Sequence, residues 1–150
     1  MNDNVLYLEE EMVEAESIIS LRTQIKNFFE TIDRVLATEY DQTNIEAVKG
    51  RLFDLANVLP STTSASAMAK KLFHKRKLRI TETLLADPDY KKLGTNMIKD
   101  LSKDKCYEEI ELLEYSDNIH KTVLEQIGVL RSIVSLYKEE LGSRVAFAMT

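Results

Sequence analysis

The sequence predicts an all-α protein built as an elongated helical hairpin or bundle, and three observations support this. Four Gly and two Pro in 150 residues are too few for strands joined by tight turns. The most frequent residues include Ala, Leu, Glu and Lys, which have high helix propensity. Two long segments carry apolar residues at alternating spacings of three and four, which is typical of helices packed lengthwise. The length suits a single domain, 1–150, with a real core.

The first three helices are expected over 4–38, 44–59 and 64–86. Thr43 or Asn44 is the expected N-cap of the second helix, and Pro60 is expected to end it. The apolar series of the first helix consists of Ile18, Leu21, Ile25, Phe28, Ile32 and Val35.

A fourth, short helix is expected over 88–101 with Asp87 as its cap, followed by the longest helix over 103–141. Gly142 stands where a C-terminal cap is common, which leaves 143–150 as a tail. The stripe of the last helix contains Ile119, Val123, Ile127, Leu130, Val134, Tyr137 and Leu141. Helices that exceed about 50 Å cannot be enclosed in a compact domain. We therefore expect the first and last stripes to form a homo-oligomer interface with coiled-coil-like packing.

One segment of the chain is strongly basic, although 20 Lys and Arg against 25 Asp and Glu give a net charge of −5. Residues 70–79 contain six cations and a histidine, and 61–81 contains no acid. Cations neutralise phosphates, and an aromatic side chain can stack on an unpaired base. The predicted nucleic-acid contacts are Lys70, Lys71, Phe73, His74, Lys75, Arg76, Lys77 and Arg79. The alternative is a solvated helix face that keeps the protein soluble.

The start of the chain is acidic, since Asp3, Glu9, Glu10, Glu11, Glu14 and Glu16 all precede the first cation. Acids are favourable at a helix N-terminus because they interact with the positive end of the helix dipole. A second interpretation is that this segment pairs with 70–79, within a chain or between copies, and competes there with nucleic acid.

No group of residues indicates an enzyme, a metal or a cofactor. Asp117 and His120 have the spacing found in carboxylate-bridged metal bundles, but the chain has only two His, so a hydrogen-bonded core or interface histidine is expected. Arg76 and Arg131 border apolar stripes and are expected to form ion pairs that set helix register. The lone Cys106 excludes an internal disulfide. Glycine-rich phosphate loops and serine elbows are absent from the sequence.

The sequence also predicts a cytoplasmic protein without a membrane partner. Its N-terminus lacks the cations of a signal peptide, and no apolar run approaches the ~20 residues that span a bilayer.

From residue 67 to 141 the chain resembles small helical bacteriophage proteins of replication and recombination, including recombination mediators of the UvsY type. The resemblance is carried by Ala69-Lys70-Lys71-Leu72-Phe73-His74-Lys75-Arg76-Lys77-Leu78, by the break at Asp87-Pro88, and by the segment from Leu130-Arg131-Ser132 to Glu139-Glu140-Leu141. It implies an oligomeric protein that binds single-stranded DNA and helps a recombinase replace a single-strand-binding protein.

The expected function is therefore that of a non-enzymatic phage accessory protein that binds single-stranded DNA without sequence preference. The principal alternative is a protein-interaction module, such as an adaptor or inhibitor of a host or phage protein, that binds no nucleic acid. A structural component of a virion is a third class. Beyond DNA and a second copy of the chain, the partners considered are a recombinase, a single-strand-binding protein and a host protein.

Overall fold

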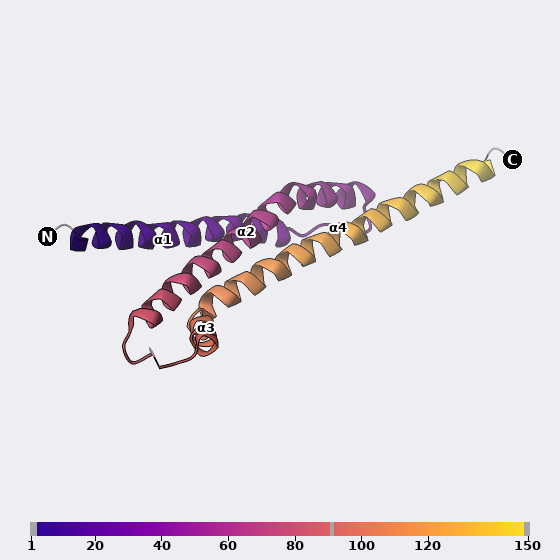
Figure 1. Cartoon of the computed structure of the whole chain (residues 1–150). Helices are drawn as coiled ribbons and strands as arrows, with labels where there is room; N and C mark the ends of the chain where they lie inside the picture. The colour runs from indigo at the N-terminus through magenta and orange to yellow at the C-terminus, as the bar shows by residue number, and fades with distance from the viewer. Residues whose placement is uncertain (1–2, 91, 149–150) are drawn as a thin grey trace.

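The structure, a computed structural model, describes residues 3–90 and 92–148, and these form four α-helices (Figure 1). The helices are α1 (Asp3–Leu36), α2 (Ile45–Ala86), α3 (Thr95–Asp104) and α4 (Tyr107–Ala148). No strand occurs within these two ranges. The predicted all-α class is confirmed.

The second helix is the centre of the molecule, because α2 packs against α1, α4 and α3. Figure 1 shows an elongated bundle in which the N-terminal part of α1 and the C-terminal part of α4 extend toward opposite ends. The short α3 lies where the chain turns from α2 into α4 (Figure 1). The predicted elongated helical bundle is therefore confirmed as well.

The core follows the predicted apolar stripes and divides into two clusters. The larger cluster joins α1, α2 and α4 and contains Ile32, Val48, Leu55, Val58, Ala65, Ile119, Val123, Ile127 and Leu130. The smaller cluster joins α1 to the second half of α2 and contains Ile18, Leu21, Ile25, Ala69 and Leu72. Burial of these side chains is the main driving force that holds the three long helices together.

The stripes that were predicted to form an oligomer interface are largely buried within one chain. Ile18, Leu21, Ile25, Ile32, Ile119, Val123, Ile127 and Leu130 are buried, and Phe28, Val35 and Val134 are partly buried. Only Tyr137 and Leu141 of that set remain exposed. The prediction failed because α2, with 42 residues, is long enough to cover both stripes itself.

The predicted break at Pro60 is wrong, since Pro60 lies inside α2. The expected helices 44–59 and 64–86 are one continuous helix. Proline removes one helical hydrogen bond, but its φ angle is compatible with a helix. Val58, Thr62 and Ala65, on either side of it, are all buried, and a continuous helix keeps them on one face. This packing outweighs the lost bond. The bend that Figure 1 shows within α2 is the usual effect of an internal proline.

The ends of the other elements also differ from the prediction. Asn44 caps α2 as expected, with Oδ1 accepting from the backbone N–H of Glu46 at 2.9 Å. Asp87, however, is the C-cap of α2, and its Oδ1 accepts from the N–H of Asp89 at 2.9 Å. The chain then makes turns, so the helix expected over 88–101 starts too early: only its part from Thr95 onward is helical, as the beginning of α3. Pro88 explains this, because the residue before a proline avoids helical geometry.

The last helix begins at Tyr107 and continues through Gly142 to Ala148, so the predicted start at 103 and the cap at Gly142 are corrected, and residues 143–148 of the predicted tail are helical. No glycine in the described part of the chain has a positive φ angle, which a left-handed cap requires. One helical Gly costs only about 0.5–1 kcal/mol, too little to end a long helix.

Candidate nucleic-acid interface

The predicted contact residues lie on the second half of α2, residues 67–86, called here the basic half. Ala69 and Leu72 face the core, whereas Lys70, Lys71 and His74 are exposed. Helical geometry places these three residues on the side of α2 opposite the buried ones. We call Lys70, Lys71 and His74 the outer face.

The remaining predicted contacts are partly buried, and three of them interact with other side chains. Lys75 Nζ donates to Ser17 Oγ of α1 at 2.8 Å. Arg76 Nε lies 3.9 Å from Glu109 Oε1 of α4. Lys77 Nζ lies 5.9 Å from the centre of the Phe73 ring, in cation–π contact. The predicted set is therefore divided between the outer face, the two residues Lys75 and Arg76 that join α2 to its neighbours, and residues such as Lys77 that interact within α2.

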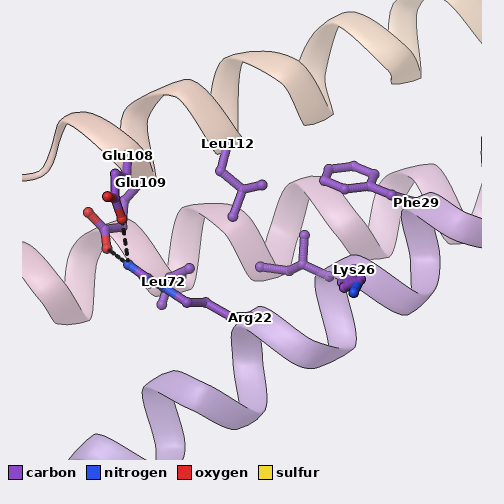
Figure 2. A pocket seen from close by; sticks show the side chains of 8 residues that line it. Arg22, Lys26, Phe29, Leu72, Glu108, Glu109 and Leu112 are labelled. Carbon is purple, nitrogen blue, oxygen red and sulfur yellow. Dashed lines mark hydrogen bonds and ion pairs between the residues drawn. The ribbon is translucent and has the colours of Figure 1, made fainter.

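Glu109 is the ionic centre of this region, because its side chain is only 3 % exposed and it meets two arginines. Arg22 Nη2 lies 2.5 Å from Glu109 Oε1 and 3.3 Å from Glu108 Oε2. Figure 2 shows Arg22 reaching from α1 to both carboxylates at the start of α4. The expected ion pair of Arg76 is thus found, and it is shared with an arginine from a third helix.

A groove of about 350 Å³ lies beside this ionic cluster, between α1 and α4 (Figure 2). Ile25, Phe29, Leu72 and Leu112 form most of its surface. The groove is mainly apolar, and its charged residues already form ion pairs: Arg22 with Glu108 and Glu109, and Lys26 with Glu30 outside the groove. It therefore offers little to a polyanion.

A second pocket, of about 390 Å³, lies at the far end of the basic half. It is lined by Arg76, Arg79, Ile80, Thr83, Leu84 and Lys105. The pattern of residues 70–79 pointed to the two arginines, but sequence reasoning missed Lys105, which comes from the connection between α3 and α4. Proximity of the two segments is a tertiary property that no local pattern signals.

Asp117 and His120 bind side chains of α2. Ser66 Oγ donates to Asp117 Oδ1 at 2.5 Å, and His120 Nδ1 lies 2.8 Å from Thr62 Oγ1. The hydroxyl proton of Thr62 is directed to Leu59 O, 2.7 Å away, so Nδ1 of His120 is the donor to Thr62. The expected hydrogen-bonded histidine is confirmed. No group of three or more metal-ligating side chains was found within the described ranges.

Two other predicted residues have simpler environments. Arg131 is exposed and takes part in none of the ion pairs found among the described residues, contrary to expectation. Cys106 is buried, and its pKa is raised mainly by desolvation and further by Glu109. A buried thiol with a raised pKa stays protonated at neutral pH and is a poor nucleophile.

The role of Arg51 was missed by sequence reasoning. Its side chain donates to the backbone oxygens of Val35 and Leu36 at the end of α1, and its guanidinium carbon lies 5.5 Å from the ring centre of Tyr40. Arg51 is only 5 % exposed. A signal was present, because Arg51 falls between Val48 and Leu55 at the spacing of the core.

The predicted pairing of the acidic start with residues 70–79 falls mostly on side chains that lie outside the described part of the structure, which includes no side chain of residues 1–14. This leaves out Asp3, Glu9, Glu10, Glu11 and Glu14, and the remaining acid, Glu16, is exposed.

Comparison of the chain with known protein families, curated proteins and solved structures found no match. Among the helices described, none combines the length and apolar character needed to cross a membrane.

Proposed function

We propose that this protein is a non-enzymatic accessory protein of the phage type that binds single-stranded DNA, without sequence preference, on the basic half of α2. The observation that carries the proposal is the outer face. Lys70, Lys71 and His74 are exposed on one side of a rigid helix, and the surrounding segment 61–81 contains no acid. The resemblance to recombination mediators extends the proposal to helping a recombinase displace a single-strand-binding protein.

The outer face suits a flexible polyanion because Lys70 lies in one row along α2 with the partly buried Lys77 beyond it. Lys70, His74 and Lys77 follow one another at intervals of four and three residues, which correspond to rises of about 6 Å and about 4.5 Å. A single strand can follow such a row and release its bound counterions. Phe73 is half-buried beneath Lys77, so binding on this face is mainly electrostatic rather than by base stacking.

A salt titration with a labelled oligothymidine tests the proposal. Lys70→Glu with Lys71→Glu is compared with Lys121→Glu and Lys138→Glu, which change the charge equally at exposed positions of α4. We expect the first pair to weaken binding at least about ten-fold and to reduce the slope of log affinity against log salt by about 1.4, or 0.7 per phosphate contact. The control pair should retain the wild-type slope.

Two outcomes would contradict this function. One is the absence of binding even in low salt. The other is an equal loss for both pairs of variants, which would mean that only the net charge matters and that the outer face is not the site.

A second candidate, a protein-interaction module, is favoured by the exposed apolar residues near the end of α4. Leu136, Tyr137 and Leu141 are 61 %, 40 % and 46 % exposed. Tyr137 and Leu141 continue the stripe of Leu130 and Val134 beyond the part that α1 and α2 cover. The same titration separates the candidates when it is combined with a search for a protein complex. A protein that binds no DNA in low salt but forms a stable complex through this surface would be such a module.

A further inference from the structure

The face of α2 that forms the core changes character after Leu72. Thr62, Ala65, Ala69 and Leu72 are buried at alternating spacings of three and four. The next positions of the same series are 76, 79 and 83, which hold Arg76, Arg79 and Thr83. A helix that needed only to pack would continue with apolar residues at these positions. Arg76 still joins α2 to Glu109 of α4, but Arg79 takes part in none of the ion pairs found among the described residues and indicates a surface available to a ligand.

The pocket of about 390 Å³ opens at these positions. Arg76 and Arg79 line it from α2, and Lys105 lines it from the connection between α3 and α4. Ile80 and Leu84 add an apolar wall to the same pocket. Its volume lies within the range of about 300–1,000 Å³ that is typical of small-ligand sites.

The charges of the pocket favour an anion. Arg76 faces Glu109 through Nε at 3.9 Å, but Glu109 also accepts a closer contact from Arg22, at 2.5 Å. Arg22 also lies 3.3 Å from Glu108, so two carboxylates face these two arginines. Arg79 and Lys105 contribute two further positive charges to the pocket. Guanidinium groups bind phosphate oxygens through paired donors, and a lysine adds a point charge.

We propose that this pocket binds one nucleotide unit of a single strand, with the phosphate held by Arg76, Arg79 and Lys105 and the sugar packed against Ile80 and Leu84. The inference rests on the proposed function and adds an anchoring point to the continuous outer face. A free nucleotide or inorganic phosphate presents the same chemistry, so the experiment has to separate these ligands from the strand.

The test uses the full chain and two variant pairs that each remove two positive charges. Arg79→Gln with Lys105→Gln alters the pocket, and Lys70→Gln with Lys71→Gln alters the outer face. Binding of thymidine 5′-monophosphate and of inorganic phosphate is followed by the broadening of their ³¹P signals, and binding of oligothymidine by fluorescence anisotropy. Circular dichroism verifies that each variant is folded. Arg79→Lys serves as the conservative variant.

We expect the wild type to broaden the signal of the nucleotide more than that of inorganic phosphate, because only the nucleotide contacts the apolar wall. The pocket pair should abolish this effect and weaken binding of the oligothymidine about ten-fold, as expected when charged hydrogen bonds to a phosphate are lost. The outer-face pair should leave the nucleotide signal unchanged, and Arg79→Lys should retain most of the binding.

The inference is overturned if the pocket pair binds both the nucleotide and the oligothymidine as the wild type does. In that case the proposed function still stands, provided that the outer-face pair loses the strand. Equal broadening of the inorganic phosphate and nucleotide signals would overturn the inference that the pocket recognises a nucleotide unit and would leave a simple anion site. If the wild type binds the nucleotide through the pocket but binds no strand, the anchoring of a strand and the proposed function both fail.

Discussion

The two halves of α2 use their polar side chains in opposite ways. In the first half, residues 45–66, called here the packed half, Arg51 and Thr62 are buried and each is hydrogen-bonded to another helix or to the end of one. In the basic half, Lys70 and Lys71 are exposed. Arg51 and Thr62 of the packed half are committed to the fold, whereas the lysines of the outer face are available to a ligand.

The comparison is clearest between Arg51 and the lysines of the outer face, because these are all cations on the same helix. The positive charge of Arg51 is balanced by the carbonyl end of α1, where the helix dipole is negative, and by the ring of Tyr40. Its Nε has no hydrogen-bond partner among the described residues. Lys70 and Lys71 are in contact with water, which solvates their charges without help from the protein.

The largest effect on stability is expected for Arg51→Met. It removes the donors from two carbonyl oxygens at the end of α1 while preserving much of the side-chain volume. We expect the free energy of unfolding to fall by about 2–3 kcal/mol, the range for hydrogen bonds that involve a charged group. Urea unfolding measures the change. Lys49→Met, at an exposed site two residues away, is the control, and an equal loss there would show that Arg51 has no special role.

A smaller effect is expected for Glu109→Gln, which tests how firmly the basic half is held by α4. The substitution removes the charge that faces Arg22 and Arg76, although the amide oxygen can still accept a hydrogen bond. We expect a loss of about 1–2 kcal/mol in urea unfolding. Glu108→Gln is the matched control because it contacts the same arginine but is 77 % exposed, and exposed pairs contribute little. Similar losses for both variants would contradict the importance of burial.

The smallest effect is expected when Lys70 and Lys71 are both replaced by Gln. Because both side chains are exposed, we expect the unfolding free energy to change by less than about 0.5 kcal/mol. A thermal or urea melt of the double variant measures this. Destabilisation by more than about 1 kcal/mol would mean that the outer face is part of the fold, and the contrast between the two halves of α2 would be lost.

The helical class and the core residues of the long helices were predictable from the sequence. The spacing of Ile25, Ile32, Val123 and Leu130 identifies their faces, and all four are buried. Periodicity cannot identify which surface covers such a stripe, however. Both stripes therefore were predicted to meet a second copy, although they meet α2.

The candidate site was predictable only in part. The density of cations in 70–79 indicated the region, but the pattern did not separate the exposed Lys70 from Arg76, which faces a buried carboxylate. Lys105 was missed because it enters the pocket from another part of the chain. The break at Pro60 was predicted from a local rule, and tertiary packing on both sides of the proline overrode that rule.

The sequence by itself determined that this chain is helical, which faces of its long helices are apolar, and where its cations are concentrated. These properties depend on composition and on the period of the α-helix, both of which are local. Only the tertiary structure decided that α2 continues through Pro60, that α2 covers the stripes of α1 and α4 within one chain, and that Arg76, Arg79 and Lys105 share a pocket. Those outcomes depend on contacts between residues far apart along the chain, where packing and desolvation outweigh local preference.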